Sequence, residues 1–524
     1  MGWAAAPQKR DQMVLFSRRL DDAIACDHPV RLLDEILGRI SWKTWEASYD
    51  GYLGQPAVHP RVLAGILLYG LLTRVRSSRK LEEALLVRLD FMWLAEGHTL
   101  DHSTLSKFRR QHQAGLKDLF VQMGLLAREL GWLPLQELAY DGTRLRSSNR
   151  PRGSRTPAEL REMQVALRQK YTELTAQAES EDVRDEETFG TGSPHKLPAE
   201  LADTNRRLRQ VDAALAELER VLTSGETVPS RIPLTDPQSR VTPNKEGGFA
   251  PNYTPLATVD SAQGLIVAAD VIALTNEEAQ LISQLKTVQT DFQLPGLPPA
   301  VLADGAMCSG PNLAALEELG VTLYSPLPGA CTATNPALRG DLTQPVPEAD
   351  WGRLPMTGSK QKPQFDKAAF VYDSEQDCYW CPSGQKLSFA RHSRETRGGQ
   401  QVDRKRYQAE ASACAGCALR SRCVQAKAKP RQVSSDQYDA QRARLAERMA
   451  QPEAQVKYKR RKEVAERPFA MIKQHFGARR FLLRGLEHVR TEWRWLATAF
   501  NLQRLMSLFS SRAGPAAKPI ALNP

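Results

Sequence analysis

The stretch YKRRKEVAERPFAMIK, residues 458–473, decides how the rest of the chain is interpreted. On a helix that turns about 100° per residue, four side chains project within roughly 140° of one another: Tyr458, Arg461, Glu466 and Lys473. One acid and three groups able to contact phosphate therefore share a face. The carboxylate can hold a hard divalent metal while the other groups hold phosphate oxygens nearby. The alternative is a solvated basic helix whose acids only balance its charge.

Composition favours a polyanionic partner. The 524-residue chain is long enough for several domains, and its 71 Lys and Arg against 60 Asp and Glu give a net charge of +11. Between Lys457 and Arg480 nine Lys and Arg stand against two Glu, so the last third is the expected DNA-facing surface. The sequence shows no run of about 18 apolar residues and no signal core. A cytoplasmic, nucleoid-associated protein without a membrane partner is expected.

Residues 1–130 are predicted to form an all-α domain. Apolar residues recur at helical spacing in VLAGILLYGLLTRV, which begins at Val62, and in the following RKLEEALLVRLDFMWLA. The segment HSTLSKFRR, residues 102–110, is predicted to be a helix start capped by Ser103 or Thr104. Its cations can reach phosphate or a groove: Lys107, Arg109 and Arg110. An ordinary helical bundle with a solvated basic edge is the alternative.

Two short apolar runs each end in an acid. LQELAYDGT, residues 135–143, carries Asp141, and PAVLADG, residues 299–305, carries Asp304. An acid at the tip of a strand is well placed for a metal, although Asp is also a common turn residue. Both positions are therefore candidates for metal ligands.

The elements between and after these two acids follow a definite order. YTPLATVDSAQGLIVAADVI has the pattern of a hairpin around residues 260–264, and Thr275 with Glu278 predicts a capping box for a helix. A helix after Ser309 and a strand in VTLYSP complete the set. Strand with acid, hairpin, helix, strand with acid, helix, strand is the order of an RNase H-like α/β core with a mixed sheet flanked by helices. In such a core the strands of Asp141 and Asp304 are neighbours, and two adjacent carboxylates require a cation such as Mg²⁺ or Mn²⁺.

Two insertions interrupt the predicted core, whose first parts are residues 131–150 and 246–330. Residues 151–245 contain two coiled-coil-like apolar stripes joined by VRDEETFGTGSPHK, a stretch without periodicity that is predicted to be flexible. An inserted antiparallel helical pair and a dimerisation arm are both compatible with this pattern.

The second insertion, residues 331–440, is rich in cysteine. Its paired C-x2-C elements predict a zinc-ribbon-like structural site, with five candidates for four ligand positions: Cys378, Cys381, Cys414, Cys417 and Cys423. A reduced, buried cluster without metal is the alternative. Residues 441–512 are expected to complete the core, and residues 513–524 to form a loose tail.

The spacing Tyr458-x2-Arg461-x4-Glu466-x6-Lys473 resembles the Y…R…E…K signature of bacterial insertion-sequence transposases of the DDE type. The D-G-T sequence after the first strand is similar to the context of that family's first acid. The resemblance covers nearly the whole chain. Glu463 is a second acid on the same helix, but Glu466 keeps the six-residue interval to Lys473.

The resemblance implies roles for these residues. Asp141, Asp304 and Glu466 would form a catalytic triad that binds two Mg²⁺ or Mn²⁺ ions, and Tyr458 and its two basic partners would contact phosphate. The helical N-terminal domain would bind terminal inverted repeats. Double-stranded DNA of the repeats and of the target is the expected partner, with a homodimer in the synaptic complex.

Three functions are compatible with this arrangement. The first is a DNA transposase that cleaves DNA and transfers strands by metal-dependent, in-line phosphoryl transfer. The second is a catalytically silent DNA-binding regulator derived from a transposase. The third is a metal-dependent nuclease without strand transfer. A recombinase with Tyr458 as nucleophile would leave Asp141 and Asp304 unexplained.

Overall fold

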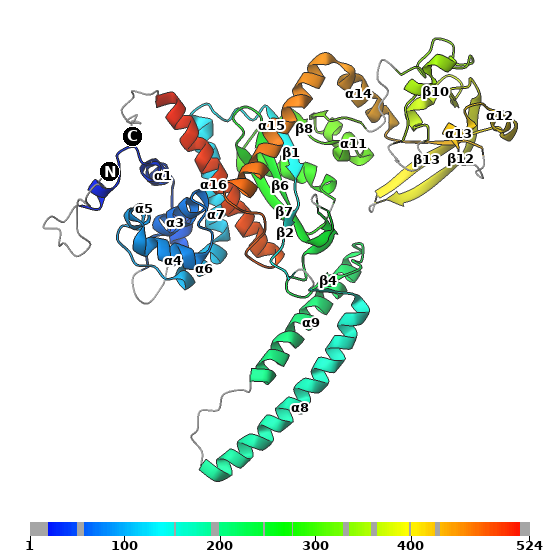
Figure 1. Cartoon of the computed structure of the whole chain (residues 1–524). Helices are drawn as coiled ribbons and strands as arrows, with labels where there is room; N and C mark the ends of the chain where they lie inside the picture. Colours follow the sequence, from blue (N-terminus) through cyan, green and yellow to red (C-terminus); the bar gives the residue numbers. More distant parts are fainter. Residues whose placement is uncertain are drawn as a thin grey trace, which may run out of the picture.

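The computed structural model is a mixed α/β protein with a helical N-terminal region (Figure 1). It describes these residues: 19–49, 57–150, 153–189, 199–244, 247–274, 276–327, 335–357, 364–397, 400–424 and 430–513. A helical hairpin and a second, cysteine-containing subdomain project from the central sheet in different directions. Residues 514–524 of the predicted tail and part of the first insertion's predicted connection lie outside the described residues.

The N-terminal region is helical, as predicted. Its helices are α1 (Pro29–Gly38), α2 (Lys43–Glu46), α3 (Pro60–Leu72), α4 (Ser78–Val87), α5 (Leu89–Leu94), α6 (His102–Gln111) and α7 (Gln113–Glu129). Helix α3 is apolar on almost every side and is buried from Val62 to Gly70, because α1, α5, α6 and the late helix α16 (Leu486–Ala513) all pack against it.

The apolar pattern after α3 forms two helices, α4 and α5, because Arg88 between them is extended (φ −114°, ψ 121°) and its guanidinium binds Asp90. One detail of this region differs from the sequence prediction. The cap of α6 is Asp101, and the prediction of Ser103 or Thr104 was wrong. The Asp101 carboxylate accepts the N–H groups of both residues, at 2.7 and 2.9 Å.

The central sheet is built around the long strand β6 (Phe249–Asp260). Its other members are β1 (Glu137–Gly142), β2 (Leu145–Arg146), β5 (Arg240–Pro243), β7 (Ile266–Ile272), β8 (Ala300–Leu302) and β9 (Thr322–Tyr324). Strands β1 and β7 pair with β6 in antiparallel orientation, whereas β8 is parallel to β1 and β9 is parallel to β8. The predicted order is confirmed, with α10 (Leu281–Asp291) before β8 and α11 (Gly310–Glu318) before β9. Of the predicted capping box, Thr275 lies outside the described residues.

The first insertion is an antiparallel pair of helices, α8 (Pro157–Phe189) and α9 (Ala199–Ser224), flanked in sequence by the paired strands β3 (Ser154–Arg155) and β4 (Ile232–Pro233). Leu160 and Leu167 of α8 pack against Val211 and Leu218 of α9, as the apolar stripes predicted. The predicted flexible connection was wrong for residues 183–189, because α8 continues through them as helix.

The second insertion has a sheet and an apolar core of its own. The sheet order is β10 (Val371–Asp373), β11 (Cys378–Trp380), β12 (Lys386–Arg397), β13 (Gln400–Ala409) and β14 (Gln432–Asp436), and all neighbours are antiparallel. Short helices α12 (Ala411–Ala415) and α13 (Arg420–Cys423) follow β13. Phe365, Leu387 and Tyr407 lie in its core, which is separate from the main one.

The chain returns to the central sheet through α14 (Asp439–Ala450) and α15 (Pro452–Gln474), and its last described helix is α16. Helix α16 lies between the N-terminal helices and the sheet (Figure 1). Its Trp495 donates a hydrogen bond to the Arg109 carbonyl (3.1 Å), and its buried Glu492 pairs with Arg76 (2.8 Å). One hydrophobic core therefore runs from the N-terminal helices into the central sheet.

Candidate active site

Small and apolar residues bring the three predicted acids to one place. Ala139 of β1, Leu302 of β8 and Ala465 of α15 are fully buried against one another. Ala139 and Leu302 are also register partners in the parallel β1–β8 pair. Asp141 lies two residues after Ala139, and Asp304 lies two residues after Leu302. Glu466 follows Ala465 directly. The packing of α15 on two neighbouring strand ends thus gathers Asp141, Asp304 and Glu466.

The Asp141 carboxylate forms an ion pair with Arg461 of α15. The Arg461 guanidinium lies 3.0 Å from its carboxylate, and the two side chains are only 11% and 15% exposed. Burial raises the pKa of the Asp141 carboxyl, whereas Arg461 and the N–H of Gly142 lower it. The negative charges of Asp304 and Glu466 raise this pKa further. The net direction of the pKa shift is upward, even with the Arg461 guanidinium beside the carboxylate.

Asp304 is held by the turn that follows β8. Its carboxylate accepts the N–H of Ala306 (3.0 Å), and its carbonyl accepts the hydroxyl of Ser325 (2.7 Å). These bonds use one carboxylate oxygen and fix the backbone, so the side chain projects from a defined turn beside β1.

Helix α15 carries three glutamates, and two of them are candidates for the third acid, Glu463 and Glu466. The charge of Glu466 raises the pKa of Asp141, whereas Glu463 is not among the main groups that shift it. Both glutamates are exposed, so neither is committed to the core.

The other three residues of the α15 signature lie around the same acids. The Lys473 ammonium donates to the Thr143 hydroxyl (2.6 Å), two residues beyond Asp141. Burial raises the pKa of Tyr458, while Arg461 lowers it and Asp304 raises it. The Nε atom of Arg461 is buried and has no partner among the described residues. A donor without an acceptor here is suited to a substrate oxygen.

Sequence reasoning missed Glu277. A Cβ atom on Gly142 would lie 2.3 Å from the Glu277 carboxylate, so this acid sits directly against the residue after Asp141. Its carbonyl accepts the hydroxyl of buried Tyr140 (2.7 Å). The only signal in the sequence was an acid next to a predicted helix cap, which does not distinguish it from a capping residue.

The three cations predicted to contact DNA from α6 have different surroundings. Lys107 and Arg110 are exposed. Arg109 instead points into the helical region, where its guanidinium donates to the Arg76 carbonyl (3.0 Å) and burial lowers its pKa. Lys107 and Arg110 therefore face solvent, whereas the Arg109 guanidinium is engaged inside the helical region.

Four of the five candidate cysteines come together. They line a hollow of about 30 Å³ at one side of the second insertion: Cys381, Cys414, Cys417 and Cys423. Cys378 lies apart, buried in β11, where the charged groups nearest its thiol are Lys386, Asp373 and Asp377. The sequence could not decide which thiol was surplus, and the structure sets Cys378 apart from the others.

No group of three or more His, Cys, Asp or Glu side chains in the described part of the chain is already arranged to hold a metal ion. At the acids, the Arg461 guanidinium occupies the place next to Asp141 that a cation would take. The donor set itself, three carboxylates, suits a hard divalent ion, and the four thiols suit zinc. The described helices also include none that is long and apolar enough to cross a membrane.

Comparison with known families adds two matches. Residues 380–506 match a family described as Transposase DDE domain, which here spans most of the cysteine-containing subdomain, α14, α15 and most of α16. Residues 18–111 match Transposase domain (DUF772), which spans the helices up to α6. No curated protein matches the chain. Glu466 lies inside the first match, whereas Asp141 and Asp304 lie outside both.

Proposed function

We propose that this chain, whose two family matches indicate an insertion-sequence DDE transposase, binds the terminal inverted repeats of its element and catalyses metal-dependent cleavage and strand transfer. The observation that carries the proposal is the meeting of Asp141, Asp304 and Glu466 at two adjacent strand ends and one helix. These acids come from distant parts of the sequence, and a purely structural role would not require them to converge.

The arrangement of the sheet supports an RNase H-like core. The order β7, β6, β1, β8, β9 has antiparallel pairing on one side of β1 and parallel pairing on the other. This order agrees with the core expected from the sequence. It also explains why the first two acids are neighbours despite the long insertion between them.

In this proposal, the chain's own residues hold substrate and compensate charge. The three carboxylates would hold two Mg²⁺ or Mn²⁺ ions, which supply activation of water or a DNA 3′-hydroxyl and stabilisation of the leaving oxygen. Without metal, Arg461 neutralises Asp141. The Arg461 guanidinium and the Lys473 ammonium would orient phosphate oxygens of the scissile strand.

The test is cleavage of a DNA fragment that carries the gene's own flanking ends, with Mg²⁺ or Mn²⁺. We expect wild-type protein to cleave it and Asp304→Asn to bind it without cleavage. The asparagine oxygen can still accept the Ala306 N–H, so the turn is preserved while the charge is lost. Cleavage by Asp304→Asn at the wild-type rate would remove Asp304 from the triad.

The same experiment separates the alternative functions. Specific binding by wild-type protein without cleavage under either metal would favour a DNA-binding regulator. Cleavage without joining of the product 3′-hydroxyl to a target duplex would favour a nuclease. The presence of all three acids, and their convergence, favours the enzyme over the regulator. A homodimer that holds two DNA ends is proposed by analogy alone.

We also propose a structural zinc ion in the second insertion. Its ligands would be the four thiols that line the small hollow. Metal analysis of purified protein is expected to find one zinc per chain, and Cys417→Ser is expected to lose it. Zinc-free wild-type protein with an intact fold would support the reduced cluster instead.

A further inference from the structure

A large cavity lies away from the acids, between the base of the helical hairpin and the loop that follows α15. Its volume is about 1130 Å³. Six arginines line it, and they define what we term the arginine groove: Arg150, Arg155, Arg206, Arg207, Arg480 and Arg484. They come from three separate segments of the chain, so the concentration of charge is produced by the fold and is not visible as a run in the sequence.

The groove carries far more positive than negative charge. Asp203 is the one acid among its described lining residues, and it pairs with Arg206. Six guanidinium groups and one carboxylate leave a net charge of +5 on the lining. Arg207, Arg480 and Arg484 are exposed, so they are available to a large ligand. Open, arginine-rich surfaces of this kind suit phosphate groups, which guanidinium binds in a bidentate manner.

Two segments of the groove lining follow, in the chain, the elements that bear Asp141 and Glu466. Strand β1 leads through β2 to Arg150, and α15 leads from Lys473 to Arg480. The two paths meet where the Phe481 N–H donates to the Arg146 carbonyl (2.8 Å). The Arg484 guanidinium in turn donates to the Ser148 carbonyl (3.1 Å). The lining of the groove is therefore tied by hydrogen bonds to the segments that follow Asp141 and Lys473 in the chain.

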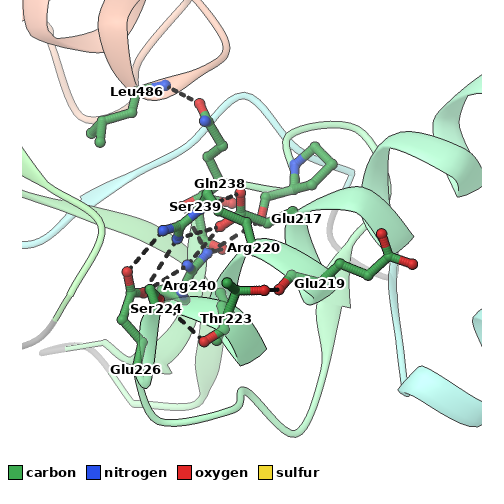
Figure 2. A network of polar contacts seen from close by, with 12 residues as sticks. Glu217, Glu219, Arg220, Thr223, Ser224, Glu226, Gln238, Ser239, Arg240 and Leu486 are labelled. Atoms are coloured by element: carbon green, nitrogen blue, oxygen red, sulfur yellow. Dashed lines mark hydrogen bonds and ion pairs between the residues drawn. The ribbon is translucent and has the colours of Figure 1, made fainter.

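The hairpin side of the groove is fixed to the core. At the root of α9, buried Glu217 binds both Arg240 (2.7 Å) and Arg220 (2.9 Å), as Figure 2 shows. Gln238 beside them accepts the N–H of Leu486, the first residue of α16 (2.6 Å). These contacts attach the C-terminal part of α9 to β5, and the loop before β5 to the start of α16.

From this geometry we infer that the arginine groove binds the phosphate backbone of the DNA segment that flanks the cleavage site, and that the inserted hairpin is a DNA clamp. The inference rests on the proposed function, because it takes DNA as the substrate of the neighbouring acids. It adds a contact surface made by the hairpin, for which the sequence had indicated only an inserted helical pair or a dimerisation arm. Backbone contacts of this type carry little sequence information.

The test measures binding of a duplex of arbitrary sequence by the full chain over a range of salt concentrations. Arg206→Gln with Arg207→Gln is expected to weaken binding and to reduce the slope of log K against log salt by about 1.8, because two phosphate contacts are lost. The matched control changes two arginines on the other helix of the hairpin, Arg161→Gln with Arg168→Gln. This control has the same charge but lies outside the groove, and we expect it to keep the wild-type slope.

A charge-preserving variant separates lost contacts from misfolding. Arg206→Lys with Arg207→Lys is expected to restore most of the slope. Equal slopes for the glutamine variant and wild type would overturn the inference that the arginine groove binds DNA. The proposed function would stay intact if wild type still binds and cleaves the flanking ends. An equal loss of slope in the control would also overturn it, since the effect would then be one of net charge. Absence of all DNA binding by wild type would overturn both proposals.

Discussion

The ion pair at the root of the hairpin gives the sharpest prediction of stability. Glu217 and Arg240 lie 2.7 Å apart and are only 7% and 9% exposed. Glu217→Ala leaves the Arg240 guanidinium buried without its main partner, which typically costs about 3–5 kcal/mol. Two features place the loss near the lower end. Glu226 remains at 3.5 Å, and one nitrogen of Arg240 keeps three backbone carbonyls as acceptors.

The Arg220 contact adds little to this value, because that side chain is 47% exposed and also binds Glu226. We therefore expect a local loss of about 3 kcal/mol, which is on the order of a 100-fold increase in opening. Amide hydrogen exchange in residues 211–224 of α9 measures this opening directly, whereas a global melting curve would mix several domains.

The control for this experiment is Glu219→Ala. Glu219 lies two residues away on the same helix and is exposed, and its contact within the network drawn in Figure 2 is made by its backbone carbonyl. This variant should exchange within a few-fold of wild type. If both variants exchange at the same rate, the buried pair does not hold the C-terminal part of α9 to β5.

Three further predictions follow from the two candidate metal sites. Glu466→Gln is expected to abolish cleavage while Glu463→Gln retains it, measured with Mg²⁺ on the flanking ends; the reverse result would move the third acid. Because burial raises the pKa of Asp141 and Arg461 lowers it, protonation should remove metal-dependent cleavage as pH falls, and Arg461→Gln should move that loss to higher pH in a single-turnover pH profile. An unchanged profile would show that Arg461 does not control this carboxyl. Cys378→Ser should keep the full zinc content by metal analysis, and loss of zinc would make Cys378 a ligand.

Local sequence patterns predicted the elements well because each pattern reflects a local cause. The apolar runs before Asp141 and Asp304 are strands, and the heptad-like stripes are the two helices of the hairpin. The adjacency of the first two acids also followed from the order of elements, and the β1–β8 register confirms that their strands are neighbours.

Features set by distant contacts could not be predicted in this way. Glu277 became part of the site only because the strand of Gly142 approaches it, and Arg109 turned inward because α16 packs beside it. The separation of Cys378 from the other thiols depends on how β11 pairs with its neighbours. The arginine groove is the largest such case, since its six side chains come from three segments that the sequence alone gives no reason to join.

The position of α16 has a consequence for synthesis of the protein on the ribosome. The side of α3, α6 and α7 that α16 covers is made early, but Trp495 is made roughly 370 residues after α7, a delay of about 20–70 s at usual elongation rates. During that time the nascent helices expose the apolar surface that α16 later covers. Helix α15, which carries Glu466, and helix α16, which covers the N-terminal helices, are synthesised one directly after the other. Under the proposed function, a nascent chain would therefore complete its DNA-binding region and its third acid at nearly the same moment.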